Sequence, residues 1–245
     1  MRMKMVISYD GTNFSGYQIQ PGKRTIQGEI EKALGKMHKI DKVPVIASGR
    51  TDSGVHAIGQ VIHFDTQLQI EPSNWLRALT SLLPSDIQII DIGKVDDHFH
   101  ARYDAKSKEY RYVIFHREQP DIFKRHYAYW VAESLDIDKM KQALTYIEGK
   151  HDFTSFCAAN SGVKGDKIRT VLQAALEEQG DEIIFTIRGD GFLYNMVRII
   201  VGTVVEVGKG KRDPEEILNI LRAKNRKVAG KTAPAHGLFL WNVQY

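Results

Sequence analysis

The order of predicted strands and helices in the first hundred residues is the feature that most restricts the fold. Apolar and polar residues alternate from Met1 to Tyr9, which predicts a half-buried strand. The segments that follow are a helix after Thr25, strands at 43–47 and 60–66, a helix between Pro72 and Pro84, and a strand at 87–95. This β-α-β-β-α-β order is the split pattern of ferredoxin-like folds.

A second series of the same kind follows residues 100–107. It comprises a strand at 108–115, an extended stretch at 126–131, a helix that stops at Gly149, a strand pair at 170–177 and 182–188, a helical stripe at 193–205, a short helix after Pro214 and a closing strand at 237–245. We therefore expect an α+β (α/β) protein of two ferredoxin-like, RRM-like halves, residues 1–105 and 106–245. Their strands are expected to form one continuous mixed, mainly antiparallel sheet, with helices on one side and the active-site cleft on the other.

The composition is that of a globular chain. With 245 residues, 42% of them hydrophobic and 26% charged, the chain can bury a full core. No apolar run is long enough to span a membrane, and the single Cys157 excludes an internal disulfide and fits a reducing cytoplasm. The net charge of +4 is compatible with a polyanionic partner. Basic residues gather between 209 and 231, where they form either a nucleic-acid surface or an ordinary solvated face.

The stretch Gly49-Arg50-Thr51-Asp52-Ser53-Gly54-Val55-His56-Ala57 places an arginine, a carboxylate and a histidine close together. Glycines near both ends allow sharp turns and close approach to another surface. We expect a strand that ends in a loop presenting Asp52. An aspartate in such a loop is also typical of a simple turn, so this motif alone leaves catalysis open.

Two residues far along the chain could cooperate with Asp52. Arg198 projects onto the edge of its helix's apolar stripe, so it either extends to water or pairs with Asp52 and keeps that acid ionised. Tyr110 lies in the middle of a strand, where it is either a packed tyrosine or a ring that stacks on a base, with a hydroxyl able to transfer a proton.

Scattered histidines raise the alternative of a metal hydrolase. The residues concerned are His56, His63, Asp65, His98 and His100. They form no H-E-x-x-H pattern, and the chain has no phosphate-binding loop with a G-x-x-x-x-G-K-[ST] spacing. We therefore expect neither a metal nor a nucleotide cofactor.

A collinear set of motifs along the whole chain resembles the tRNA pseudouridine synthase A family. The motifs are Tyr9-Asp10-Gly11-Thr12-x-Phe14-x-Gly16-x-Gln18, Gly49-Arg50-Thr51-Asp52-x-Gly54-Val55-His56-Ala57, Gln60-Val61-x-His63-Phe64, Lys108-x-Tyr110-x-Tyr112, His151-Asp152-Phe153-Thr154-x-Phe156, Arg169-Thr170, Gly191-Phe192-Leu193-x-x-Met196-Val197-Arg198 and Thr232-Ala233-Pro234-Ala235-x-Gly237-Leu238.

The resemblance implies an isomerase that converts uridine to pseudouridine in the anticodon stem-loop of tRNA, at positions 38, 39 and 40. Such an enzyme cleaves the N-glycosidic bond and rejoins the base through C5. The resemblance also implies a cytoplasmic homodimer that binds one tRNA with both subunits and needs no cofactor, metal or membrane. The alternative is a non-catalytic RNA-binding module, since ferredoxin-like halves often bind RNA through their sheet.

The resemblance also assigns site residues. Asp52 matches the catalytic aspartate, Tyr110 the active-site tyrosine, and Arg198 the arginine that pairs with the aspartate. Arg50, Tyr110, Leu193 and His56 match substrate-binding positions, and Arg50 is expected to take the place of the extruded base.

Overall fold

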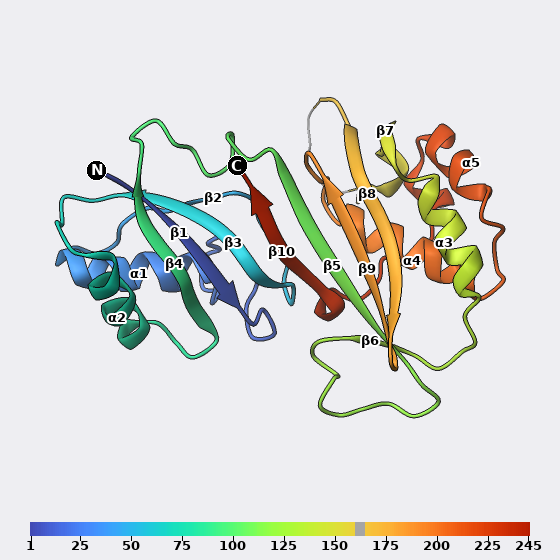
Figure 1. Ribbon diagram of the computed structural model, residues 1–245, viewed down its shortest axis with the longest axis horizontal. Helices are drawn as coiled ribbons and strands as arrows, with labels where there is room; N and C mark the ends of the chain where they lie inside the picture. Colours follow the sequence, from blue (N-terminus) through green and yellow to red (C-terminus); the bar gives the residue numbers. More distant parts are fainter. Residues whose placement is uncertain (160–164) are drawn as a thin grey trace. The chain divides into compact units, whose positions relative to one another are not determined.

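The computed structural model of the chain describes residues 1–159 and 165–245 (Figure 1). These residues contain both strands and helices, which confirms the predicted α+β class. The chain divides into two compact units, Met1–Lys106 with Phe239–Tyr245, and Ser107–Leu238. The sequence had placed the last seven residues in the second half. Their grouping with the first unit has a physical cause, because Phe239 and Leu240 pair in parallel with the start of a strand in that unit.

The first unit follows the predicted order of elements. These are β1 (Arg2–Tyr9), α1 (Ile26–His38), β2 (Ile46–Ala47), β3 (His56–Asp65), α2 (Pro72–Leu82) and β4 (Ile87–Val95). The strands lie in the order β4-β1-β3-β2, and each neighbouring pair is antiparallel. This is the arrangement of a split β-α-β ferredoxin-like unit.

The predicted strand at 43–47 is shorter in the structure than the sequence suggested. The side chains of Val43 and Val45 are buried, as the apolar run indicated. Their backbone N–H groups, however, donate to the backbone and side-chain oxygens of Glu31 in α1, at 3.3 and 3.2 Å. Because these donors are taken by a helix, only Ile46–Ala47 joins the sheet.

The ends of both helices in this unit follow local sequence signals. Thr25 caps α1, since its Oγ1 accepts from the backbone N–H of Gly28 at 3.3 Å. Pro72 occupies the first turn of α2, where its missing N–H costs nothing. The helices meet through the rings of His38 and Trp75, whose centroids are 5.9 Å apart.

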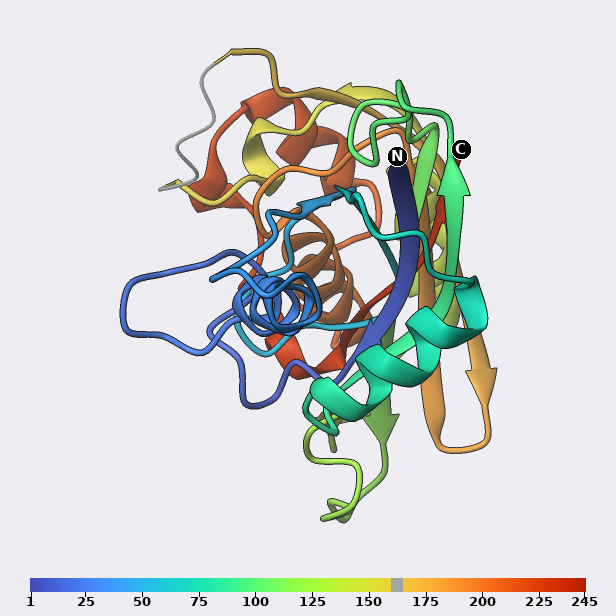
Figure 2. The ribbon, with the colours of Figure 1, turned by 90° about the vertical axis from the view of Figure 1, so that its left-hand side faces the viewer.

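The second unit is a mainly antiparallel sheet with helices packed on one face (Figures 1 and 2). Its strands are β5 (Ser107–His116), β6 (Tyr129–Val131), β7 (Gly149–Asp152), β8 (Ile168–Gln179) and β9 (Glu182–Gly189). The order is β5-β9-β8-β7, and β6 pairs in parallel with β5. Its helices are α3 (Ile137–Thr145), α4 (Met196–Gly208) and α5 (Glu216–Ala223), with short 3₁₀ turns at Thr154–Phe156, Arg226–Val228 and Ala235–Gly237. The last strand of the chain is β10 (Leu238–Gln244).

Helix α3 ends earlier than its predicted stop at Gly149. The N–H of Ile147 donates to the carbonyl of Leu144 at 3.0 Å, and this turn ends the helix at Thr145. Gly149, with φ +99°, instead opens β7. The glycine thus marks the entry to a strand.

Helix α4 is the core helix of the second unit. Eleven of its thirteen residues are buried, so it is covered on nearly all sides rather than on one stripe. None of the helices in the described parts of the chain is long and apolar enough to cross a membrane.

Candidate active site

Asp52 lies in the loop between β2 and β3, which we call the Asp52 loop (residues 48–55). The backbone turns back at Gly54, with φ +77°, and the N–H of Val55 donates to the carbonyl of Asp52 at 3.1 Å. The turn leaves Asp52 half-buried and Arg50 exposed. A negative and a positive side chain are therefore presented by one rigid turn.

The opening motif of the chain, residues 9–18, forms the backing of this loop. A Cβ added to Gly11 would lie 2.0 Å from the carbonyl oxygen of Val55, and one on Gly16 would lie 3.0 Å from that of Thr51. Only glycine allows such close contact at both positions. The N–H of Tyr17 also donates to the carbonyl of Thr51 at 3.0 Å. The opening motif and the Asp52 motif, which are thirty residues apart in the sequence, thus pack together as one structure.

Buried polar side chains fix the start of the Asp52 loop. Gln60 in β3 is fully buried, donates to the carbonyl of Gly49 at 2.9 Å and accepts from the hydroxyl of Ser48 at 2.7 Å. The hydroxyls of Tyr9 and Thr51 lie 2.8 Å apart. Burial raises the pKa of Tyr9 to about 12, although hydrogen bonds with Thr51 and Gln60 oppose the shift. Tyr9 therefore stays neutral and acts as a structural group.

His56 holds the other end of the loop. Its side chain is 1% exposed, and its Nδ1 accepts from the N–H of Gly11 at 3.0 Å and lies 3.2 Å from a carboxylate oxygen of Asp10. Its ring stacks on Phe239, with centroids 4.8 Å apart. This burial suits a residue that supports the loop, and the contact with substrate implied by the resemblance stays a prediction.

Tyr110 and Leu193 belong to the second unit. Tyr110 lies in β5 opposite Ile187 and is 8% exposed. Its ring meets that of Phe192 edge to face, with centroids 5.2 Å apart. Leu193, which precedes α4, is 5% exposed. Sequence reasoning gave Phe192 no role, although the residue lies inside a quoted motif beside Leu193.

Arg198 lies in the first turn of α4 and is half-buried, as its place on the helix predicted. Its Nη1 donates to Oδ1 of Asn195 at 2.9 Å, and its Nε donates to the carbonyl of Ala233 at 2.8 Å. Asn195, with φ +61°, is the residue from which the helix begins. Two fixed acceptors therefore orient the guanidinium plane.

The histidines raised as possible metal ligands have structural contacts instead. Among the described residues, no group of three or more His, Cys, Asp or Glu side chains could hold a metal ion. His63 is buried, its Nδ1 accepts from the N–H of Ala101 at 3.1 Å, and its ring meets that of His100 at 4.9 Å. Burial, with the nearby Arg2 cation, lowers the pKa of His63 to about 4.

The lowered pKa of His63 predicts a loss of stability in mild acid. The unfolded chain takes up a proton near pH 6.5, whereas the folded chain resists it until about pH 4. The free energy of unfolding should therefore be level above pH 6.5 and fall between pH 6.5 and 4. His63→Asn, which keeps an acceptor for Ala101, should flatten this fall in urea titrations. The exposed His98→Gln should not, and an equal slope in His63→Asn would show that His63 is not its source.

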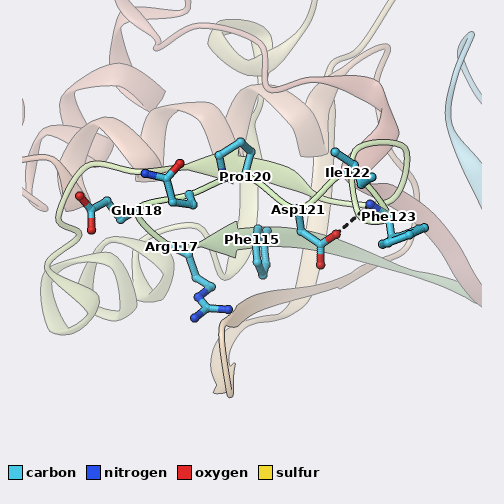
Figure 3. A pocket seen from close by; sticks show the side chains of 8 residues that line it. Phe115, Arg117, Glu118, Pro120, Asp121, Ile122 and Phe123 are labelled. Atoms are coloured by element: carbon cyan, nitrogen blue, oxygen red, sulfur yellow. Dashed lines mark hydrogen bonds between the residues drawn. The ribbon is translucent and has the colours of Figure 1, made fainter.

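A cavity of about 480 Å³ lies in the second unit (Figure 3). It is lined by Phe115 and the loop residues 117–123 between β5 and β6, where the N–H of Phe123 donates to Oδ1 of Asp121 at 2.8 Å. The loop projects past the end of β5 (Figures 1 and 2). No predicted site residue lines this cavity.

A family model described as tRNA pseudouridine synthase matches residues 5–104 and 143–245. The chain belongs to the tRNA pseudouridine synthase family. It is 56% identical to a protein of Bacillus licheniformis and 54% identical to one of Bacillus subtilis, over all of this chain and 99% of each relative. It is also 54% identical to a protein of Geobacillus kaustophilus, over all of this chain and 94% of that relative. All three relatives are named tRNA pseudouridine synthase A.

Members of the tRNA pseudouridine synthase family isomerise uridine in tRNA. The chain is therefore an isomerase that acts on tRNA, as the sequence motifs predicted. This membership rules out the alternative of a non-catalytic RNA-binding module, and it leaves no support for a metal hydrolase.

Proposed function

We propose that this enzyme isomerises uridines 38, 39 and 40 in the anticodon stem-loop of tRNA, as a cytoplasmic homodimer that uses no metal or cofactor. The observation that carries the proposal is the Asp52 loop, which buried side chains and two close glycine contacts hold rigidly while Asp52 and Arg50 stay accessible. The names of the relatives, which match this chain over its whole length, support the choice of substrate.

The reaction sets the chemical requirements of the site. The N1–C1′ bond of uridine breaks, the uracil turns, a C5–C1′ bond forms, and the proton lost from C5 is balanced by one gained at N1. The isomerisation is redox-neutral overall, so it needs no external oxidant or reductant. The three possible roles for a carboxylate are attack on the ribose, attack on the base and removal of a sugar proton, and each of them requires the ionised form. We assign this role to Asp52.

We assign to Arg198 the role of keeping Asp52 ionised. A guanidinium close to a carboxylate favours its charged form and can bind both oxygens at once. Asn195 and Ala233 already hold the Arg198 side chain in one orientation. The proposal therefore pairs Asp52 with a cation whose orientation is already set, so that little ordering of Arg198 is left to occur during the reaction.

The remaining residues are assigned to binding of the flipped nucleotide. Extruding a base from a helix costs a few kcal/mol, which a side chain that fills the vacated place can offset. Arg50 is exposed beside Asp52 and is assigned to that place. Leu193 provides an apolar contact for the uracil, and His56 acts by holding the Asp52 loop.

We assign two roles to Tyr110. Its ring stacks on the uracil, and its hydroxyl transfers the C5 proton. Phe192 meets the Tyr110 ring at a right angle and so fixes its plane. We expect Tyr110→Phe to lower kcat about a hundredfold, the usual size of a general acid–base contribution, while KM for tRNA stays within about twofold. Single-turnover release of tritium from C5-labelled uridine measures this. Full turnover in Tyr110→Phe would show that the hydroxyl transfers no proton.

The substrate assignment is tested by mapping pseudouridine in tRNA from cells with and without this protein. Loss of pseudouridine at positions 38, 39 and 40 alone would support the proposal, and loss only at other positions would contradict it. Light scattering should give the mass of two 27.8 kDa chains. A monomer with full activity would contradict the dimer.

A further inference from the structure

The segment Ala229–Pro234, which we call the strap, runs along helix α4 in unusually close contact. A Cβ added to Gly202 in α4 would lie 1.8 Å from the carbonyl oxygen of Lys231. A Cβ on Gly230 would lie 2.8 Å from the Cα of Thr203. Only glycine can occupy these two contact positions, because a Cβ at either one would push the strap away from the helix.

Hydrogen bonds fix the position of the strap along the helix as well. The N–H of Gly230 donates to Oγ1 of Thr203 at 3.0 Å. The N–H of Lys231 donates to Oε1 of Glu206 at 3.1 Å, and the other carboxylate oxygen of Glu206 accepts from Nε of Arg212 at 2.7 Å. The strap is therefore aligned with successive turns of α4.

The far end of the strap holds Arg198 by two bonds. The N–H of Ala233 donates to the backbone carbonyl of Arg198 at 3.0 Å, and the carbonyl of Ala233 accepts from Nε of Arg198 at 2.8 Å. The next carbonyl, that of Pro234, accepts from the hydroxyl of Tyr112 at 2.8 Å. Burial raises the pKa of Tyr112, which therefore remains a hydrogen-bond donor. The strap thus joins Arg198 to the middle of β5.

Arg226 holds the strap at two points, its first residue and Thr232. Its Nη2 donates to Oγ1 of Thr232 at 3.1 Å, and its Nη1 donates to the carbonyl of Ala229 at 3.3 Å. The side chain is half-buried, and burial lowers its pKa. A half-buried arginine with two neutral acceptors in one short segment suits a group that fixes backbone shape.

We infer that Arg226 and Thr232 are positioning residues for the isomerisation, because they hold Ala233 where it sets the Arg198 guanidinium. This inference rests on the role proposed for Arg198. A misplacement of about 1 Å in a catalytic group can cost about a hundredfold in rate, and loss of one bond from Arg226 should cost less than that. The effect should appear in kcat rather than in KM, because the strap acts through the bond between Ala233 and the Arg198 cation.

The experiment compares Thr232→Val with Thr232→Ser in steady-state tritium release over a range of tRNA concentrations. Valine keeps the shape of threonine but removes the acceptor for Arg226, whereas serine keeps it. We expect Thr232→Val to lower kcat about tenfold with KM for tRNA within about twofold, and Thr232→Ser to stay within about twofold of the wild type. Thr145→Val is the matched control, since Thr145 is an exposed residue of α3 whose hydroxyl donates to the carbonyl of Gln142 at 2.7 Å.

Several outcomes would overturn the inference. An unchanged kcat in Thr232→Val would do so, as would a change confined to KM or a failure of Thr232→Ser to restore the rate. The control for stability is Val207→Ala, a core variant of α4 chosen for an equal fall in Tm. A fall in kcat of Thr232→Val no larger than that of Val207→Ala would indicate a merely structural role for Thr232. If Thr232→Val does not fold, Arg226→Lys, which keeps the charge but loses the two-pronged donor, should show the same fall in kcat.

Arg198→Met, assayed in parallel, separates this inference from the proposed function. A wild-type kcat in Arg198→Met would contradict the role of Arg198 and the strap together. A large loss in Arg198→Met with none in Thr232→Val or Arg226→Lys would contradict the strap alone.

Discussion

Asp52→Asn is expected to abolish tritium release from C5-labelled uridine in tRNA, with a loss on the order of 10⁴-fold or more in single-turnover rate. The amide has nearly the shape of the carboxylate but is neutral, so it can neither attack the ribose or base nor accept a sugar proton. Affinity for tRNA should change little, because one carboxylate contributes little to a contact dominated by backbone phosphates.

The design of this test follows from the structure of the loop. The turn is closed by the backbone carbonyl of Asp52, which accepts from Val55 and is unchanged in the variant. Asp138→Asn is the matched control, an exposed carboxylate in the first turn of α3, and should release tritium at the wild-type rate. Release by Asp52→Asn above a tenth of the wild-type rate would remove Asp52 from the mechanism. Loss of tRNA binding with tritium release retained would show that Asp52 serves binding and not the chemical step.

Arg198→Met should produce the second-largest effect, a fall in kcat on the order of a hundredfold or more with little change in KM. Methionine fills much of the same space but carries no charge, so nothing in its place favours ionised Asp52. Arg198→Lys keeps the charge without the planar donors that bind Asn195 and Ala233, and should recover only part of the rate.

Added guanidinium provides a sharper form of the same test. It should partly restore release in Arg198→Ala, where the side chain leaves room for the ion, and should not help Asp52→Asn. Arg77→Met, which alters an exposed arginine of α2, should behave as the wild type. A wild-type kcat in Arg198→Met, or an effect on KM alone, would contradict the pairing of Arg198 with Asp52.

Most of the fold could be predicted because the strands and helices carry clear periodic patterns. In β1, every second residue from Met3 to Tyr9 is buried, as the alternation indicated. The features that the sequence did not indicate depend on contacts between distant segments. Glu31 takes the N–H groups of Val43 and Val45, and the last strand pairs with His56–Ala57 of β3. Neither contact leaves a pattern within its own segment.

The candidate site stood out in the sequence where its residues carry charge in an unusual setting. Asp52 stood between glycines, and Arg198 stood on the edge of an apolar stripe, where the structure leaves it half-buried. The supports of these residues were less visible, because many are backbone groups, such as the carbonyls of Gly49 and Ala233, which have no signature in a sequence. Gln60 offered a usable signal, because it is a polar residue directly before the apolar Val61 and Ile62 of its strand.

The most direct test of the central claim is a crystal structure of the enzyme bound to tRNA. The Asp52 carboxylate is expected within about 4 Å of the Arg198 guanidinium, the span of an ion pair, and in contact with a uridine that has left the anticodon stem. A uridine bound against another acid, or an Asp52 carboxylate far from Arg198 while the uridine is seated, would contradict it.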